Sequence, residues 1–177
     1  MDPDARVQAA TLGTSLHFKQ IPDTSSGPFI GQGGSYASKE SLESQLATYT
    51  RVYGLASTPD FGGQPNTIDT TTLDNTKAET SVLGLQPAAE VTYEINMMTF
   101  NDNNGYAHNL RAVKALADEH KKAHWVVYKA SGVIIEYDAY THISYTADAQ
   151  QDVEKFSIYH DIRSDITVSL PATSASN

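Results

Sequence analysis

Residues 125–144 read Trp125-Val-Val-Tyr-Lys-Ala-Ser-Gly-Val-Ile-Ile-Glu-Tyr-Asp-Ala-Tyr-Thr-His-Ile-Ser144. The apolar runs on either side of Ala130-Ser-Gly132 predict two strands joined by a hairpin turn. Every second residue from Val133 to Ile143 is suited to a buried face, which predicts that the second strand lies against a core. At about 3.3 Å per residue this strand spans roughly 40 Å, so we expect it to be bent.

The rest of the chain supplies more strands and one clear helix. Tyr106, Leu110, Val113 and Ala117 are spaced by four, three and four residues, which predicts an amphipathic helix ending near residues 121–122. Residues 38–49 fit a short helix, with strand character at the end of that segment. Alternating apolar and polar residues predict further strands at 15–19, 48–53, 89–97, 152–161 and 166–170.

This order predicts a fold that is mainly β: an antiparallel β-sandwich or barrel flanked by one α-helix. The length of 177 residues suits a single domain. Within it we expect an N-terminal strand or arm (1–50), a long loop (52–85), core strands plus the helix (86–170) and a C-terminal tail (171–177).

The long loop is the least ordinary feature of the sequence. Loops beyond about 15 residues are uncommon in compact domains and are usually functional or disordered. This one carries apolar residues that need a surface to bury against, at Leu55, Phe61, Ile68, Leu73, Val82 and Leu83. Its threonine-rich run, residues 67–72, fits a polar edge strand as well as a strand that joins a neighbour's sheet.

The composition of the chain disfavours several classes of function. The chain has 12 Lys and Arg residues against 21 Asp and Glu residues, a net charge of −9, which disfavours nucleic-acid binding because phosphates are repelled. It contains no cysteine, so disulfides and thiolate metal sites are excluded. Charged residues make up only 19%, which fits protein interfaces as well as an ordinary β-rich domain. We expect no membrane span and no signal peptide, because apolar runs are short.

No constellation in the sequence predicts catalysis. His120 and His124 are four residues apart, but Glu119 precedes the first of them and two lysines lie between, unlike a metalloprotease helix. Solvated histidines at a helix end explain them better. The segment Gly31-Gln-Gly33-Gly34 lacks the continuation of a phosphate-binding loop and fits a flexible loop. We therefore expect no enzyme activity, no cofactor and no metal.

Residues 52–170 resemble the major tail tube proteins of long-tailed, siphovirus-type bacteriophages. The resemblance rests on Gly54-Leu-Ala-Ser-Thr-Pro-Asp-Phe-Gly-Gly-Gln-Pro65, followed by Ile68-Asp-Thr-Thr-Thr-Leu-Asp74. It implies hexameric rings that stack into a hollow tube through which DNA leaves during genome ejection. The implied location is the virion tail, after synthesis in the host cytoplasm. The implied partners are other copies of the chain, the tape measure, the tail terminator and the distal tail protein, with DNA only in transit.

The resemblance also assigns roles to residues. The loop is expected to contact neighbouring subunits through Gly54, Leu55, Pro59, Asp60, Phe61, Gly62, Gly63, Ile68, Thr70, Thr71, Leu73 and Asp74. Acidic residues of long strands are expected to line the lumen and repel DNA, namely Glu90, Glu94, Glu136 and Asp138. Two alternatives stay open: another tail component, such as a tail-completion or baseplate ring, and a small β-rich protein-binding domain.

Overall fold

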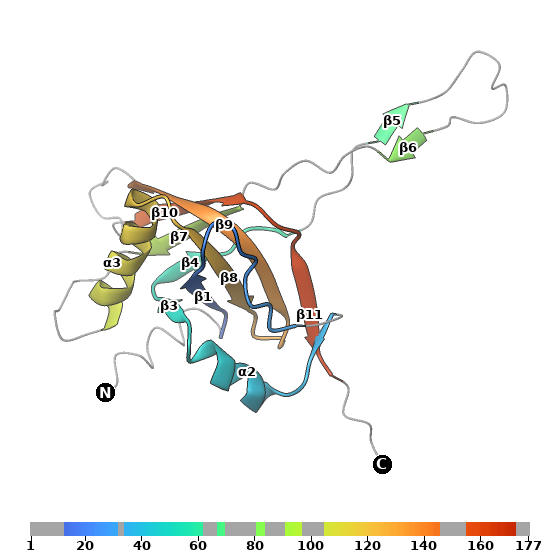
Figure 1. Cartoon of the computed structure of the whole chain (residues 1–177), viewed down its shortest axis with the longest axis horizontal. Helices are drawn as coiled ribbons and strands as arrows, with labels where there is room; N and C mark the ends of the chain where they lie inside the picture. The colour runs from blue at the N-terminus through green and yellow to red at the C-terminus, as the bar shows by residue number, and fades with distance from the viewer. Residues whose placement is uncertain are drawn as a thin grey trace.

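Nine of the strands in the described residues form one curled sheet (Figure 1). The computed structural model describes residues 13–31, 34–61, 67–69, 81–83, 91–96, 105–145 and 155–172. The sheet contains β1 (Ser15–Gln20), β2 (Ser35–Tyr36), β3 (Thr50–Val52), β4 (Leu55–Ser57), β7 (Val91–Asn96), β8 (Lys122–Tyr128), β9 (Ile134–Tyr145), β10 (Lys155–Ile162) and β11 (Thr167–Pro171). A separate ribbon pairs β5 (Thr67–Asp69) with β6 (Ser81–Leu83), and the helices are α2 (Lys39–Leu46) and α3 (Gly105–Asp118).

The strand order shows how the sheet curls. Its main path runs β3-β1-β8-β9-β10-β7-β4, and all neighbours on this path are antiparallel. The two end strands, β3 and β4, follow each other in the chain with only Tyr53 and Gly54 between them. Two residues cannot span a flat seven-strand path, because neighbouring strands lie about 4.8 Å apart. The sheet therefore curls strongly, which confirms the predicted antiparallel, barrel-like fold.

The long strand β9 has two partners on one side. Residues 139–145 pair with β10, whereas residues 134–136 pair with β11. Figure 1 shows β9 curving across the sheet. The predicted turn before it is present, since Gly132 has a φ of 87° and Lys129 and Val133 close the hairpin with a 2.8 Å hydrogen bond.

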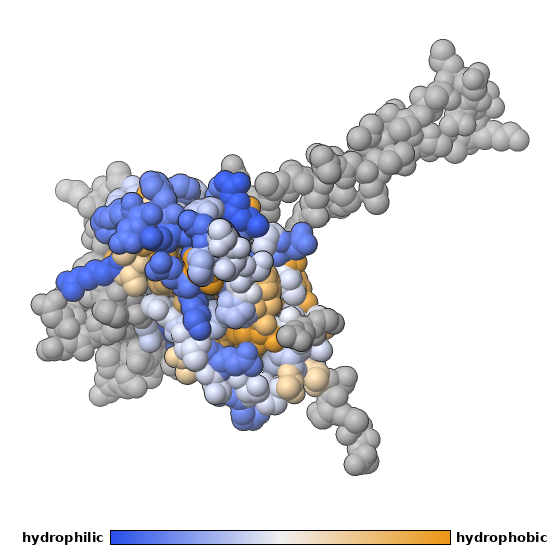
Figure 2. Space-filling model, in the orientation of Figure 1, coloured by the Kyte–Doolittle hydropathy of each residue, from blue (hydrophilic) through white to orange (hydrophobic). Residues whose placement is uncertain are grey.

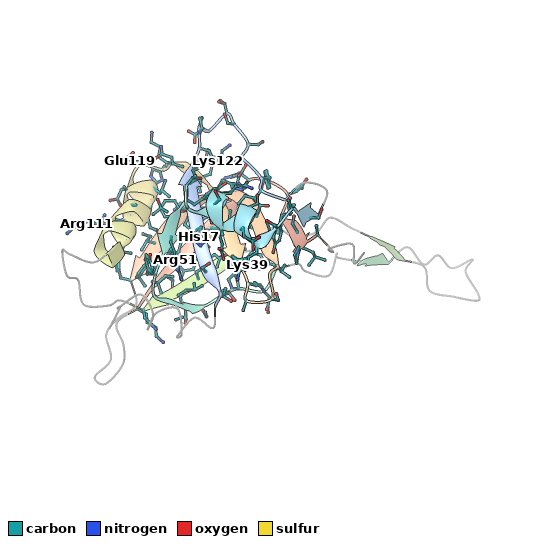
Figure 3. The ribbon with its side chains drawn as sticks, turned by 90° about the horizontal axis from the view of Figure 1, so that it is seen from below. His17, Lys39, Arg51, Arg111, Glu119 and Lys122 are labelled. Atoms are coloured by element: carbon teal, nitrogen blue, oxygen red, sulfur yellow. The ribbon has the colours of Figure 1, made fainter. Side chains whose placement is uncertain are left out.

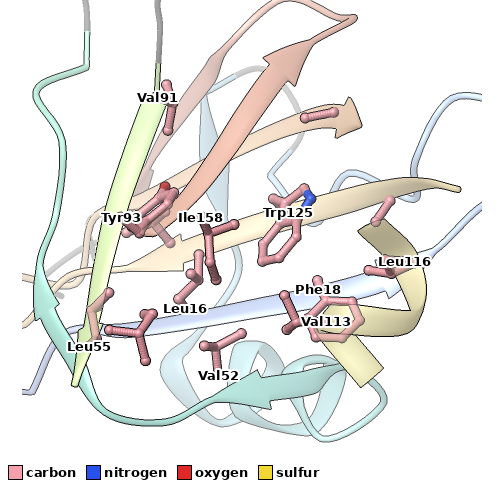
Figure 4. Packing of buried hydrophobic residues seen from close by; sticks show 14 of the residues in the cluster. Leu16, Phe18, Val52, Leu55, Val91, Tyr93, Val113, Leu116, Trp125 and Ile158 are labelled. Atoms are coloured by element: carbon pink, nitrogen blue, oxygen red, sulfur yellow. The ribbon is translucent and has the colours of Figure 1, made fainter. Parts of the chain in front are cut away.

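The inner face of the curled sheet holds the main core (Figure 4). Trp125, Tyr93 and Tyr137 have no solvent exposure, and α3 covers the open side with Val113 and Leu116. These side chains come from alternate positions of neighbouring strands, as the sequence pattern predicted. Burying a large apolar side chain contributes about 1.5–3 kcal/mol, so this cluster dominates the stability of the fold.

The outer face of β8 and of the first half of β9 is also covered. Helix α2 contributes Leu42 and Leu46 to a second cluster with Tyr36, Val126 and Ile134. The side chain of Ser38 caps the helix by accepting a hydrogen bond from the backbone of Ser41. This helix lies in the segment 38–49, where the sequence fits a short helix, so the described residues contain two helices, α2 and α3.

Helix α3 ends three residues before the predicted end. His120 has a positive φ of 49°, and backbone bonds join His120 N to Ala117 O and Lys121 N to Leu116 O. This pattern is a Schellman motif, in which a left-handed residue closes the helix. It releases the chain into β8, which begins at Lys122.

Candidate functional site

The predicted assembly loop begins at the junction of the two sheet edges. Gly54 has a φ of 81°, and a Cβ there would lie 2.6 Å from Asn96 O, so only glycine fits without strain. Gly54 O accepts a 2.8 Å hydrogen bond from Asn96 N. This glycine lets the chain pass from β3 to β4 in two residues, which is a structural reason for its place in the motif.

Some predicted interface residues are used within the chain. Leu55 is only 7% exposed and belongs to the core cluster, so its side chain is not available to a neighbour and that assignment is corrected. Phe61 packs against the core, with its ring centroid 5.9 Å from that of Tyr137. Pro59 is half-buried and Asp60 is exposed. The loop's spaced apolar residues thus find their surface partly in their own barrel.

Further along the loop, Ile68 lies in β5 opposite Val82 of β6. Among the described residues, β5 and β6 pair with each other and with no other strand, and Figure 1 shows this β5–β6 ribbon well away from the nine-stranded sheet. The predicted interface residues that lie outside the described residues are Gly62, Gly63, Thr70, Thr71, Leu73 and Asp74.

The four predicted lumen residues do not share one environment. Glu94 is exposed on β7, and Glu90 lies outside the described residues. Glu136 and Asp138 are 0% and 2% exposed, so they cannot line a lumen and that prediction is wrong for both. Their alternation with apolar residues resembled a solvated face, but α2, residues 27–31 and Tyr36 cover that face.

Glu136 and Asp138 form a buried cluster with His124. Nδ1 of His124 lies 2.7 Å from Asp138 Oδ1, and Nε2 lies 3.3 Å from Glu136 Oε1. The imidazole ring of His124 thus lies between the two buried carboxyl groups. The prediction of two solvated histidines is therefore wrong for His124, which is fully buried, and right for His120, which is exposed.

Backbone groups complete the cluster. Gly27 N donates to Asp138 Oδ2 at 2.9 Å, while Ile30 N and Gly31 N donate to the two oxygens of Glu136 at 2.7 and 2.9 Å. Charged hydrogen bonds of this kind are stronger than neutral ones. They fasten the segment 27–31 onto the sheet. Gly31, expected in a flexible loop, is buried and bound.

The two glycines of that segment allow this close approach. A Cβ on Gly27 would lie 2.1 Å from His124 Nδ1, and one on Gly31 would lie 1.9 Å from Ser169 Oγ. The cluster also affects Tyr49, which lies over it. Burial raises the pKa of Tyr49 to about 12, and the negative charges of Glu136 and Asp138 contribute to this increase. The buried cluster thus attaches residues 27–31 to the outer face of the sheet through hydrogen bonds.

A second polar chain crosses the inner core. Tyr93 and Tyr137 share a 2.7 Å hydrogen bond between hydroxyls, and the hydroxyl of Tyr137 lies 2.8 Å from Nδ1 of His160. Desolvation raises the pKa of both tyrosines and lowers the pKa of His160 to about 3. The three side chains are therefore neutral at pH 7 and serve as hydrogen-bonded core.

The sequence contained one signal for the buried cluster that the predictions missed. In β8, Ala123, Trp125 and Val127 face the core while Val126 lies on the opposite face in a second buried cluster. A strand that is apolar on both faces is covered on both. Polar residues that share a face with Val126, such as His124, are then buried as well.

Two absences concern only the part of the chain that the structure describes. There, no group of three or more His, Asp or Glu side chains is arranged to hold a metal ion. No helix in those same residues is long and apolar enough to cross a membrane.

Comparison with known proteins adds one structural likeness. No protein-family model and no curated protein matches the chain. Among solved structures, the chain is similar to one titled "Crystal structure of Hcp protein", with a TM-score of 0.33 and 11% sequence identity over 84% of this chain and 88% of that chain. Similarity at this level carries no statement about function, so the proposal below rests on this chain's own residues.

Proposed function

We propose that the chain is a non-enzymatic structural subunit that assembles with copies of itself into stacked rings, forming a tube of the phage-tail type that conducts DNA. One observation carries the proposal. Strands β4 and β7 are paired neighbours, with Leu55 opposite Ile95, so the segment 58–90 leaves and re-enters the sheet at the same edge. It contains the separate β5–β6 ribbon.

A segment built this way suits contact between subunits. The nine-stranded sheet forms without the ribbon, because no strand of that sheet pairs with β5 or β6 in the described residues. Isolated two-stranded hairpins are marginally stable in water and need further packing. A neighbouring subunit supplies that packing in a ring, which also agrees with the motif of this segment.

Two exposed features give the neighbour something to contact. Among the described residues, the edge of β4 opposite β7 has no partner strand, and open edges favour pairing with another chain. Figure 2 shows apolar surface over β9 and β11. Val168 and Leu170 of β11 are 50% and 54% exposed, and apolar surface of this kind is typical of protein contacts.

The charge of the chain suits a conduit better than a DNA-binding protein. A net charge of −9 per copy accumulates in a ring and repels a passing duplex. Of the predicted lumen residues, Glu94 is the described one whose side chain is exposed. The location in a virion tail and the partners tape measure, tail terminator and distal tail protein belong to this proposal.

Negative-stain microscopy of the purified protein tests assembly directly. We expect rings and tubes from the wild type. Replacing residues 64–86 by a short Gly-Ser linker is expected to leave a folded monomer. The deletion starts after Phe61 because that ring packs against Tyr137, and the linker closes easily because β4 and β7 are paired.

A matched control inserts the same linker after Ser25, in the exposed turn that Ser25 N and Pro22 O close. This variant keeps the ribbon and should still assemble. Tubes from the deletion variant would show that segment 64–86 is not the assembly element. A wild type that stays monomeric at every concentration would overturn the proposed function, and single closed rings would favour a tail-completion or baseplate component.

A further inference from the structure

A small pocket opens beside helix α2, and Tyr49, which lies over the buried cluster, is one of its lining residues. Its volume is about 310 Å³, near the lower end of the range for small-ligand sites. Its polar wall comes from Ser15, His17 and Arg51, and its apolar wall from Leu46, Tyr49 and Tyr128. Strands β1 and β3 and the end of α2 therefore all contribute.

Two neighbouring polar atoms of this pocket lack a partner. His17 and Arg51 are opposite each other in the β1–β3 pair, and Figure 3 shows them together beside α2. Nδ1 of His17 and Nε of Arg51 are both buried without a hydrogen bond, and His17 is only 8% exposed. Buried polar atoms are nearly always hydrogen-bonded, so this pair points to a bound acceptor.

The chemistry of the two atoms specifies that acceptor. Burial, and then the charge of Arg51, lower the pKa of His17 to about 4, so its ring is neutral at pH 7. Nε2 of His17 lies 2.9 Å from Ser15 Oγ. When Ser15 donates to Nε2, Nδ1 carries the ring proton and can donate it. Arg51 Nε–H is always a donor. The pocket thus presents two donors and one positive charge.

We propose that this pocket binds a carboxylate, which accepts from Arg51 Nε and His17 Nδ1. A carboxylate suits the site because one anionic group bridges two adjacent donors. Leu46 and the tyrosine rings suit the carbon chain that carries it. A more highly charged phosphate is disfavoured, because Glu43 also lines the pocket and its carboxylate is only partly offset by Lys39 Nζ at 3.8 Å.

The carboxylate has two sources. It is either a free small organic acid or an acidic side chain of a second copy, since the chain has 21 acidic residues against 12 basic ones. The second source rests on the proposed function, and the first does not. The two are separated by measuring the same reporter, the ring resonances of His17, under two conditions.

In the first arm, dilute monomeric protein is titrated with sodium propionate and observed by NMR. We expect a saturable shift of the His17 ring resonances. Arg51→Gln should weaken the binding by about tenfold or more, because it removes a charged donor. Arg51→Lys, which keeps the charge but has no Nε–H, should fall between them. Arg163→Gln, a matched loss of one exposed arginine on the far side of β9, should bind like the wild type.

In the second arm, protein concentration is raised without propionate. A shift of the same resonances in the wild type, absent from Arg51→Gln and reversed by excess propionate, identifies the neighbour's side chain as the source. A propionate shift without any concentration dependence identifies a free acid, and this result stands even if the proposed assembly fails. His17 resonances that respond to neither propionate nor protein concentration would overturn the carboxylate pocket.

Discussion

Nδ1 of His124 lies 2.7 Å from Oδ1 of Asp138, its partner across the β8–β9 pair, and the two side chains are 0% and 3% exposed. A carboxylate in this position is expensive to desolvate, and its cost is offset only while every partner stays in place. Gly27 N holds the second oxygen of Asp138. Asp138 and Glu136, which accepts hydrogen bonds from Ile30 N and Gly31 N, therefore both hold the outer cover on the sheet.

Asp138→Asn tests that role of Asp138. The amide keeps the shape but loses the charge, and its NH₂ must face either the His124 ring or Gly27 N–H. Breaking a buried charged pair costs about 3–5 kcal/mol, and we expect a loss of this size in urea unfolding. Glu94→Gln, the same type of change at an exposed position, should stay within about 0.5 kcal/mol. Equal effects from the two variants would show that the cluster does not fasten the cover.

Gly31 and Ser169 are predicted to be coupled. A Cβ at position 31 would meet Ser169 Oγ at 1.9 Å and Ser169 Cβ at 2.4 Å, so Gly31→Ala forces the segment 27–31 away from Glu136. Overpacking of this kind costs about 1–3 kcal/mol. Ser169→Gly removes both clashing atoms, and the double variant should recover most of the loss. A double-mutant cycle measures this coupling, and additive losses would contradict it.

The periodicity of the sequence predicted the strands of the inner core because every second residue in them faces that core. In β9, Ile135, Tyr137 and Ala139 all face the core, and a period of two reports such a strand directly. The turn before Val133 was equally readable, because Gly132 needs a positive φ. Local sequence rules thus identify the residues that face the inner core, although Ile134, Glu136 and Asp138 on the opposite face are buried as well.

The buried cluster was not predictable in the same way. Glu136 and Asp138 alternate with apolar residues in a pattern that ordinarily marks a solvated face. They are buried because residues 27–31, more than a hundred positions away, bring three backbone donors to them. Long-range backbone hydrogen bonds leave no periodic trace in a sequence. The ends of segments were misplaced for a related reason: His120 adopts a left-handed conformation that usually belongs to glycine.

Acid is predicted to destabilise the protein through two buried histidines. The pKa of His17 is about 4 and that of His160 about 3, both below the ordinary 6.5. As the pH falls below 6.5, the unfolded chain takes up these protons before the folded one does. Stability is therefore lost between pH 6.5 and about 4 for His17, and down to about 3 for His160, with about 1.4 kcal/mol per pH unit for each group.

His17→Gln checks this assignment. Urea unfolding of the wild type and of the variant at pH 7 and pH 4 should show that the variant loses about 3 kcal/mol less over this range. The difference arises because glutamine does not titrate. His142→Gln is the control, since His142 is exposed on β9. Wild type and His17→Gln curves that fall in parallel would assign the acid sensitivity to other groups.

Phe61 is predicted to stabilise the single subunit, whether or not it also contributes to assembly. Its ring lies 5.9 Å from Tyr137 and 6.5 Å from Tyr93, with Lys129 Nζ 6.0 Å from its centroid. Phe61→Ala removes these contacts from a half-buried position, so we expect a loss of about 1–3 kcal/mol, below the 3–5 kcal/mol of a fully buried ring. The measurement is urea unfolding at protein concentrations too low for assembly. Asp60→Ala, the exposed neighbour, is the control and should change stability by less than about 0.5 kcal/mol. An unchanged monomer with defective tubes would instead assign Phe61 to the contact between subunits.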